Sequence, residues 1–372
     1  MVRALILVAL ITPISHITVA AAEKAAPLLE QQELFRAGVR GYKLFRIPSL
    51  AVTNRGTILA FAEGRRDPPR DWGNNDLAMR RSFDGGRNWT EIEVIADGGA
   101  LTMGNPCPVV DRTTGTIWML FCRGSEPGRG NAEVLVMKST DDGEHWSKPH
   151  NISRMTKDPA WPYVFTGPGH GIQLRTGRLL VPAAADLTKR CGETQFSYCF
   201  YSDDHGASWK WGQPLTHQAC DECDVAELVD GTIYLNARPR EQKRRAYAFS
   251  KDGGHSWSEV EYETAQPTSD CDGAVIRLTD TSRFRKNRVL VSCPANTNAR
   301  THLTVHLSYD ECRTWPVSKL INPGSSRYSD LAVAGDNTIL CLYEAEQEYI
   351  TLARFNIEWL TDGADTIQRK AK

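Results

Sequence analysis

The sequence predicts an all-β fold made of six similar units, and three observations support this prediction. A motif with the pattern Ser-x-Asp-x-Gly-x-x-Trp recurs along the chain, and a second repeat recurs independently of it at spacings of 50 to 62 residues. Strong helical periodicity is absent. Because a unit of that length holds about four strands with their turns, which is one propeller blade, we predict a six-bladed β-propeller.

The second repeat is a turn dipeptide followed by a β-rich apolar run, and it marks one strand in each unit. Glycine (29 residues) and proline (19 residues) separate short β-branched or aromatic runs, which is the pattern of an all-β chain. We place the propeller at residues 31–362, an expectation that leaves no room for a separate lectin or catalytic domain. The six copies begin at Gly56, Gly115, Gly177, Gly231, Asn287 and Asn337.

The Ser-x-Asp motif has the chemistry of a hairpin turn rather than of a site. Its Asp can accept backbone N–H groups, its Gly can adopt a positive φ, and its Trp can pin the loop onto the sheet. In the fifth copy Cys312 replaces the glycine, so that turn must adopt its conformation without glycine's freedom; the sixth unit has no recognisable copy. The copies run from Ser82 to Trp89, Ser139 to Trp146, Ser202 to Trp209, Ser250 to Trp257 and Ser308 to Trp315.

The N-terminus has the layout of a cleaved signal peptide. Arg3 precedes an apolar stretch from Ala4 to Ile14, and small residues follow through Ala22. The stretch is too short for a spanning helix and Pro13 interrupts it, so an uncleaved anchor is the weaker alternative. We therefore expect residues 1–22 to be removed and no membrane span to remain. The protein is then secreted or lies in the lumen of the secretory pathway, with extracellular, periplasmic and lysosomal destinations all open.

The charge balance and the cysteine spacing argue against two kinds of binding site. Lys plus Arg (44) nearly cancels Asp plus Glu (45), so no electrostatic footprint for nucleic acid appears. Ten cysteines in an exported chain permit disulfides, and Cys191 with Cys199 is the local pair to test first. Cys220 and Cys223 form a single C-x-x-C with no second pair at zinc-finger spacing. We expect a structural role for both and predict neither a metal nor another cofactor.

Charged and polar residues gather just beyond the ends of the six repeated strands. Because blades are related by rotation about the axis, these ends lie on one face of the ring. When several arginines and carboxylates point into one shallow axial pocket, groups of like charge repel one another unless a ligand or partner charge compensates them. This arrangement therefore indicates a binding site. The residues are Glu63, Arg65, Arg123, Asp186, Arg238, Arg240, Asn296, Arg300 and Glu344.

The chain resembles the sialidases (neuraminidases) over essentially its whole mature length. Residues 45–48, Phe-Arg-Ile-Pro, match the Phe/Tyr-Arg-Ile-Pro signature near the start of these enzymes, and the Ser-x-Asp motifs match their Asp boxes. The resemblance implies an exo-α-sialidase that hydrolyses terminal sialic acid with retention through a covalent sialyl-tyrosine intermediate. It implies sialylated glycoproteins, glycolipids or oligosaccharides as partners, and it leaves the linkage preference and the oligomeric state open.

In the family, three arginines clamp the carboxylate of sialic acid, and Arg46, Arg238 and Arg300 match them by local context. A guanidinium fork suits a planar carboxylate better than an ammonium group does. Any one of these arginines alone would be read as a surface charge, so the assignment depends on the three together. Glu344 resembles the carboxylate that orients the first arginine, and Arg65 resembles a contact to a sugar hydroxyl.

The general acid/base aspartate of the family lies six residues after an Ala-Glu-x-Arg arginine, which corresponds here to Asp71 after Arg65. Asp67 is a nearby competitor, but the Asp-Trp-Gly context favours Asp71. A mobile loop at this place would let the acid reach the leaving oxygen. Asn105 is expected to line the same pocket.

The nucleophile implied by the resemblance is Tyr328, activated by Glu222. Sialidases with a tyrosine nucleophile are a recognised exception to the two-carboxylate scheme of glycosidases. The anomeric carbon of sialic acid bears a carboxylate, which repels an anionic nucleophile but not a neutral phenol. Glu227 is a second acidic candidate, but strand alternation sends positions 222 and 227 to opposite faces if no bulge intervenes, so we prefer Glu222.

Three alternatives share parts of this interpretation. A trans-sialidase or an anhydro-forming sialidase has the same site and differs in how water reaches the glycosyl-tyrosine. A non-catalytic sialic-acid-binding propeller keeps the arginines but loses Tyr328, Glu222 or Asp71, all of which are present. A structural propeller for protein contacts needs no arginine trio.

Overall fold

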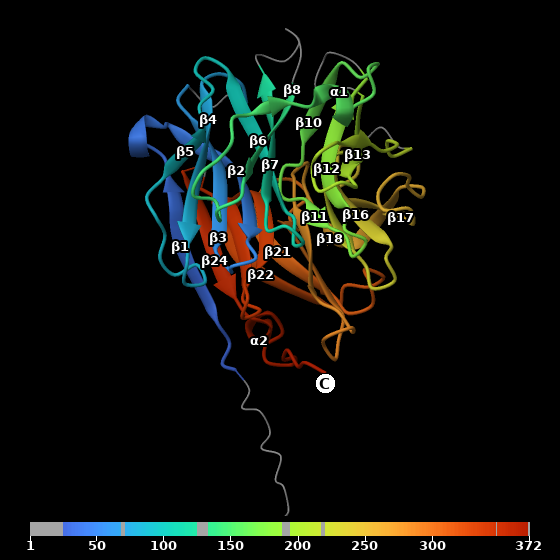
Figure 1. The fold of residues 1–372 in the computed structure, drawn as a ribbon. Coiled ribbons are helices and arrows are strands. Elements are labelled where there is room, and N and C mark those ends of the chain that lie inside the picture. The colour runs from blue at the N-terminus through green and yellow to red at the C-terminus, as the bar shows by residue number, and fades with distance from the viewer. Residues whose placement is uncertain are drawn as a thin grey trace, which may run out of the picture.

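The computed structural model describes residues 25–67, 71–124, 133–187, 194–216, 220–346 and 348–370, and this part of the chain is almost entirely β (Figure 1). The predicted signal peptide at residues 1–22 lies outside the described residues. Helical structure in the described part is limited to the 3-10 turn η1 (Val39–Gly41) and to the single turns α1 (Ser153–Thr156) and α2 (Ile357–Leu360). The fold is a six-bladed β-propeller, as the repeats predict.

Blades 1 to 3 are antiparallel meanders that follow one another in sequence. Blade 1 is β2 (Leu44–Val52), β3 (Ile58–Arg65), β4 (Asn75–Ser82) and β5 (Glu93–Ala96). Blade 2 is β6 (Thr102–Val110), β7 (Ile117–Gly124), β8 (Glu133–Ser139) and β9 (His150–Asn151). Blade 3 has an innermost strand in two parts, β10 (Tyr163–Thr166) and β11 (Ile172–Gln173), followed by β12 (Leu179–Asp186), β13 (Gln195–Ser202) and β14 (Lys210–Trp211).

Blades 4 to 6 repeat the pattern, and the last two share one long strand. Blade 4 is β15 (Cys220–Glu227), β16 (Ile233–Pro239), β17 (Arg244–Ser250) and β18 (Glu261–Pro267). Blade 5 is β19 (Ala274–Thr279), β20 (Arg288–Pro294), β21 (Thr301–Ser308) and the first half of β22 (Val317–Val333). Blade 6 is the second half of β22, β23 (Ile339–Ala345), β24 (Tyr349–Phe355) and β1 (Leu29–Arg36).

The ring closes because the first strand completes the last blade. β1 pairs antiparallel with β24, with Leu29 opposite Phe355, and Figure 1 shows the two strands side by side in blue and red. At the centre, the innermost strand β2 of blade 1 lies against β22 of blade 6. The other contacts round the ring are β2 with β6, β6 with β10, β12 with β15, β15 with β19, and β19 with β22. Both ends of the propeller are thereby held in one blade.

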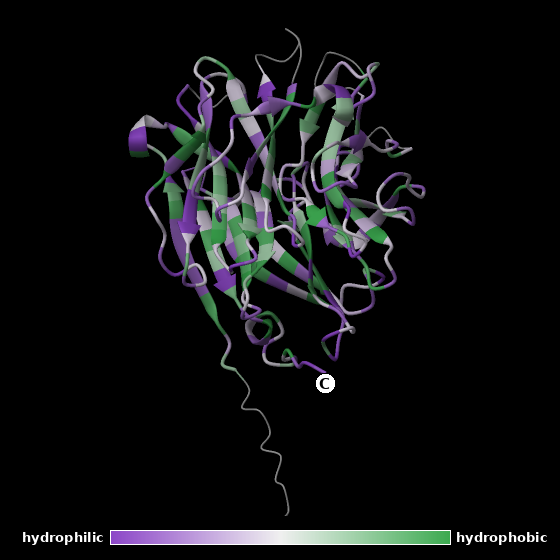
Figure 2. Cartoon of the chain, viewed as in Figure 1, coloured by the Kyte–Doolittle hydropathy of each residue, from purple (hydrophilic) through white to green (hydrophobic). Residues whose placement is uncertain are grey.

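Six large clusters form most of the hydrophobic core of the described residues, and each of them lies between two neighbouring blades. One example packs Ile58 and Ala60 of blade 1 against Leu340 and Leu352 of blade 6. The five other clusters lie at the five remaining junctions of the ring. Figure 2 shows the hydrophobic residues along the strands and many of the hydrophilic ones in the connecting loops. Burial between blades therefore holds the ring together, since each sheet alone has two apolar faces to cover.

The Ser-x-Asp motifs form the predicted turns. In the first copy, Asp84 accepts hydrogen bonds from the backbone N–H groups of Arg87 and Asn88 at 3.0 and 2.9 Å. The N–H of Gly86, whose φ is 86°, donates to the Ser82 hydroxyl at 2.9 Å. Cys312 in the fifth copy adopts φ 65° and donates its N–H to Ser308 at 3.0 Å, so the turn keeps its conformation without glycine, as expected.

The tryptophans of these turns insert between blades rather than only onto their own sheet. Trp146 of blade 2 meets Phe61 of blade 1 edge-on, with the ring centroids 6.1 Å apart. Trp209 of blade 3 contacts Trp118 of blade 2 in the same way at 6.4 Å. Each of these turns therefore attaches its blade to the preceding one.

Gly206→Ala is expected to destabilise the fold more than an alanine at another positive-φ glycine does. Gly206 has φ 85°, and a Cβ atom there would lie 2.3 Å from Trp118. Gly56 has φ 86° but no atom within 4 Å of such a Cβ, so Gly56→Ala carries the backbone strain alone. In urea denaturation, we expect the free energy of unfolding of Gly206→Ala to be lower than that of Gly56→Ala by about 1–3 kcal/mol. Equal values would contradict the close approach of the two blades.

The described cysteines and helices bear on three further predictions. Nine cysteines are buried with free thiols, among them Cys199, whereas Cys191 lies outside the described residues. Cys220 and Cys223 belong to the hydrophobic cluster between blades 3 and 4, which confirms their structural role. Within the described ranges, no helix has the length and apolar character needed to cross a membrane.

Candidate active site

The innermost strands of four blades carry register shifts near the ends that face the predicted site. The shifts lie between Arg46 and Ser49, Gly104 and Cys107, Cys220 and Cys223, and Ser326 and Ser329. Because a bulge places extra residues opposite one partner residue and turns their side chains, it re-aims side chains at functional sites. The first shift begins at Arg46, and the other three contain the predicted site residues Asn105, Glu222 and Tyr328.

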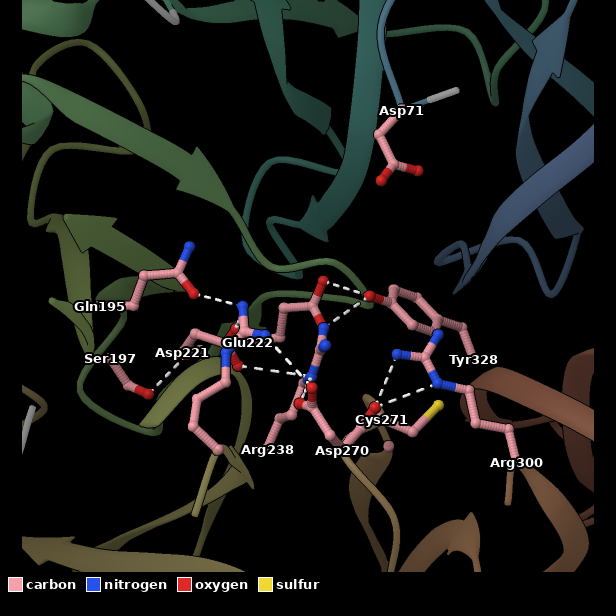
Figure 3. Close-up of polar contacts among 12 residues, drawn as sticks. Asp71, Gln195, Ser197, Asp221, Glu222, Arg238, Asp270, Cys271, Arg300 and Tyr328 are labelled. Atoms are coloured by element: carbon pink, nitrogen blue, oxygen red, sulfur yellow. Dashed lines mark hydrogen bonds and ion pairs between the residues drawn. The ribbon is translucent and has the colours of Figure 1, made fainter. Parts of the chain in front are cut away.

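Tyr328 lies at the centre of the site and is buried (Figure 3). Its hydroxyl donates a hydrogen bond to Glu222 at 2.5 Å and accepts one from Arg238 at 2.9 Å. Burial raises the pKa of the Tyr328 phenol well above its ordinary value, and the Glu222 carboxylate adds to this, although Arg238 and Arg46 oppose it. The residue is therefore a neutral phenol with a carboxylate already in position to accept its proton.

Arg238 holds this pair in place from the end of β16. It donates to Glu222 and, through Nε, to Asp270 at 2.5 Å. Asp270 also contacts Arg240 at 3.2 Å, and Arg240 in turn pairs with Asp221 at 2.6 Å. Burial opposes the charge on Arg238, but the surrounding carboxylates outweigh this and raise its pKa. The arginine stays charged beside the phenol.

Arg46, on β2, also lies beside Tyr328. Its guanidinium binds both oxygens of Glu344, at 3.1 and 3.3 Å, and lies 5.1 Å from the centroid of the Tyr328 ring. Glu344 also accepts the N–H of Ile47 at 2.9 Å, so one buried carboxylate fixes both the strand and the guanidinium. A two-point contact of this kind sets the plane of an arginine side chain.

Arg300 completes a set of three guanidinium groups around the phenol. It lies 5.8 Å from the Tyr328 ring centroid and donates to the main-chain carbonyl of Asp270 at 3.0 and 2.6 Å. The structure therefore brings Arg46, Arg238 and Arg300 together around one residue. Since they are drawn from three different blades, only ring closure makes this possible.

Glu63, Arg65 and Asp71 form a second group beside the first. Arg65 is buried and donates to Glu63 at 2.6 and 2.9 Å and to Asp71 at 2.8 Å. Asn105 has φ 53° and donates its backbone N–H to Glu63 at 2.8 Å, so its main chain supports this group.

Asp71 also accepts from Arg46 at 3.2 Å, and its side chain is 71% exposed. Figure 3 shows it apart from the hydrogen-bonded group of Tyr328, Glu222 and Arg238. The competitor Asp67 instead accepts the N–H of Asn74 at 3.0 Å. Among the two aspartates, Asp71 is the one in contact with arginines of the site.

The structure corrects one step of the sequence argument and adds one residue. A bulge does intervene between Cys220 and Cys223, so strand alternation cannot decide between Glu222 and Glu227. Position decides instead, because Glu227 lies at the far end of β15 and accepts the N–H of Arg175. The missed residue is Asp270, on the segment between β18 and β19; its place just ahead of an innermost strand was the signal that could have revealed it.

Not every strand-end residue joins the site. Arg123 pairs with Glu133, Asp186 accepts from Thr194, and Asn296 donates to Thr301. A cavity of about 520 Å³ opens along the axis, and none of the predicted site residues lines it.

The geometry of the site defines a class of protein. A neutral phenol bonded to a carboxylate, with three guanidinium groups around it, suits a substrate whose electrophilic carbon bears an anionic group. The protein is a β-propeller in which three guanidinium groups surround a buried phenol hydrogen-bonded to a carboxylate.

Comparison with known proteins agrees with this class. The family model described as a BNR repeat-like domain matches residues 56–341. The chain is 35% identical over 359 residues to a sialidase of Micromonospora viridifaciens, covering 90% of this chain and 55% of that protein. It is 32% identical over 357 residues to sialidase-2 of Mus musculus, covering 86% of this chain and 93% of that protein. The solved structure of Hadza microbial sialidase Hz136 matches with a TM-score of 0.79 at 28% identity, covering 88% of this chain and 68% of that chain.

This chain belongs to the sialidase family. It spans little more than half the length of the Micromonospora relative, 55%, and most of the length of the mouse relative, 93%.

Proposed function

We propose that the protein is a retaining exo-α-sialidase that releases terminal sialic acid from glycoproteins, glycolipids or oligosaccharides. The observation that carries the proposal is the 2.5 Å hydrogen bond from the Tyr328 hydroxyl to Glu222, set among three arginines. Relatives named as sialidases support the same substrate class. In keeping with the sequence, residues 31–362 form the catalytic domain, and residues 1–22 direct the protein into the secretory route.

Substrate binding begins with the carboxylate of sialic acid. Arg46, Arg238 and Arg300 supply charge-assisted donors, and such bonds to a planar carboxylate are about twice as strong as neutral ones. Glu344 keeps Arg46 in the orientation that the clamp needs. Arg65 contacts a sugar hydroxyl and Asn105 lines the pocket beside it.

The first chemical step forms a covalent sialyl-tyrosine. The Tyr328 oxygen attacks the anomeric carbon while its proton passes to Glu222. The bond from the anomeric carbon to the glycosidic oxygen breaks, and that oxygen takes a proton from Asp71. A neutral phenol is favoured here because the anomeric carbon bears a carboxylate that repels an anionic nucleophile.

The second step releases the sugar. Asp71, now a carboxylate, takes a proton from water, and the water oxygen attacks the anomeric carbon. The bond to the Tyr328 oxygen breaks, and the phenolate recovers its proton from Glu222. Two inversions at one carbon give net retention.

Proton NMR of the purified protein acting on a 2,3-linked sialyllactose tests the proposal. We expect the α-anomer of free sialic acid to appear first, because retention fixes the configuration before mutarotation. A 2,7-anhydro product would instead make the protein an intramolecular trans-sialidase, and transfer to an added acceptor sugar would make it a trans-sialidase. No release from any linkage would favour a sialic-acid-binding propeller.

A further inference from the structure

A buried charged layer lies directly behind the proposed nucleophile and its base. Asp330 follows Tyr328 by two positions on β22, and Asp224 follows Glu222 by two positions on β15. Both aspartates are fully buried, and His170, on the segment between β10 and β11, lies between them. Its Nδ1 is 2.7 Å from Asp330 and 3.5 Å from Asp224.

This layer connects strands that no backbone ladder joins. β15 pairs with β16 in blade 4, whereas β22 pairs with β21 and β23 in blades 5 and 6. The hydrogen-bonded sheets therefore do not set the distance between Tyr328 and Glu222. Within the described residues no backbone hydrogen bond joins these two strands, and side chains on the axis bridge them.

The two carboxylates extend the link to further blades. Asp330 accepts the N–H of Leu50 in blade 1 at 2.7 Å, and Asp224 accepts the N–H of Val275 in blade 5 at 3.0 Å. Together with His170 from blade 3, the layer ties the innermost strands of five blades. Each carboxylate is thus held by main-chain donors, which leaves its position little freedom.

The two aspartates favour the charged form of His170. Burial opposes its protonation, but Asp224 and Asp330 outweigh burial and raise its pKa to about 9. Two buried carboxylates without a cation between them would repel each other strongly. The atoms of these three residues that could bind a metal ion lie within 4.8 Å of one another. The 2.7 Å contact between His170 Nδ1 and Asp330 is nevertheless a direct hydrogen bond, because a metal ion bound at about 2.0–2.2 Å to both atoms would hold them further apart.

We propose that His170 is a positioning residue: by bridging Asp330 and Asp224 across the axis, it fixes the separation of β22 and β15 and so holds Tyr328 against Glu222. The inference rests on the proposed function, since it concerns the step in which Tyr328 transfers its proton. His170 does not touch the substrate. It acts on the chemical step through the two strands.

Two variants test this role, His170→Ala and His170→Asn. Alanine removes the bridge, and asparagine keeps a neutral donor near the position of Nδ1. We expect kcat on sialyllactose to fall about 10²-fold in His170→Ala, because small misplacements of reacting groups cost that much, and less in His170→Asn. The inhibition constant of free sialic acid is expected to stay within about twofold of wild type, because the arginine clamp is left intact.

His306→Asn is the matched control. His306 is also buried, and its Nδ1 contacts Ser318 at 2.8 Å, but it lies on β21 away from the axis. This variant is expected to lose thermal stability without losing kcat. It separates the loss of a buried histidine from the loss of the axial bridge.

The outcomes are distinct. A lower kcat with an unchanged inhibition constant in the His170 variants supports the proposal, and His170→Asn decides the matter if His170→Ala does not fold. Folded variants with kcat within twofold of wild type, or with kcat and sialic acid binding weakened in parallel, overturn it. A wild-type protein without activity on any sialoside would instead overturn the proposed function itself.

Discussion

Tyr328→Phe is expected to lower kcat on sialyllactose by on the order of 10³-fold or more, since removing a covalent nucleophile costs up to roughly 10⁶-fold. The variant deletes one oxygen, the atom that bonds to the anomeric carbon in the proposed mechanism. Glu222 keeps its contact with Arg238, and the phenyl ring keeps its place beside Arg46 and Arg300. Folding should therefore survive, which circular dichroism and the melting temperature check.

Tyr198→Phe is the control for this substitution. Tyr198 is another buried phenol, and its hydroxyl donates to the carbonyl of Thr156 at 2.8 Å in blade 3. We expect a stability loss of about 1 kcal/mol from the missing hydrogen bond and an unchanged kcat. Near-normal turnover by Tyr328→Phe would refute the nucleophile assignment. A covalent adduct trapped on wild-type Tyr328, located by peptide mass spectrometry, would support it directly.

The architecture was predictable because its determinants are local. Each Ser-x-Asp turn is specified by a few adjacent residues, and the spacing of the second repeat gives the length of a blade. Even the exception at Cys312 could be stated in advance, because hydrogen bonds to Ser308 require the same conformation with or without glycine. The insertion of the tryptophans between blades was not predictable in detail, since it depends on the neighbouring blade.

The membership of the site was predictable only in part. Rotational symmetry brings the ends of the repeated strands to one face, and Arg65, Arg238 and Glu344 do lie in the group of side chains that surrounds Tyr328 and Asp71. Symmetry does not show which strand ends reach the axis. Arg123 and Asn296 were therefore grouped with the others, although Arg123 binds Glu133 and Asn296 binds Thr301. The contacts between residues 46 and 344, or 222 and 328, depend on closure of the ring.

The bulges are the part that sequence reasoning missed. Ile47 has φ 57°, a conformation that a β-branched residue rarely adopts, and its propensity gives no sign of it. Its N–H bonds to Glu344 at 2.9 Å, so a tertiary contact stabilises the unusual backbone. The axial layer around His170 was missed for a similar reason, because its three members come from three blades and none of them stands out in the sequence alone.

The electrostatics of Asp71 lead to a prediction about pH. Desolvation by neighbouring residues raises the pKa of Asp71, but Arg65 and Arg46 outweigh it and hold the pKa below its ordinary value. When the carboxylate of the substrate pairs with Arg46, the positive field at Asp71 weakens and the pKa of Asp71 rises. Because kcat reports the bound complex and kcat/KM the free protein, we expect the alkaline limb of kcat to lie at higher pH than that of kcat/KM.

Asp71→Asn removes the acid while keeping the size of the side chain. On sialyllactose, we expect kcat to fall about 10²–10⁴-fold, the usual contribution of a general acid, and the alkaline limb of kcat to disappear. A nitrophenyl sialoside should lose much less, because nitrophenolate leaves without a proton. Equal losses on the two substrates would mean that Asp71 does not protonate the leaving group.

Asp67→Asn is the matched control, because Asp67 lies on the same segment and was the competing candidate. Its carboxylate accepts the N–H of Asn74 rather than a guanidinium of the site. Near-normal turnover is therefore expected, with both pH limbs preserved. The reverse result, an inactive Asp67→Asn beside an active Asp71→Asn, would move the acid to Asp67. The segment would then have to rearrange on binding, since of these two aspartates it is Asp71 that contacts both Arg46 and Arg65.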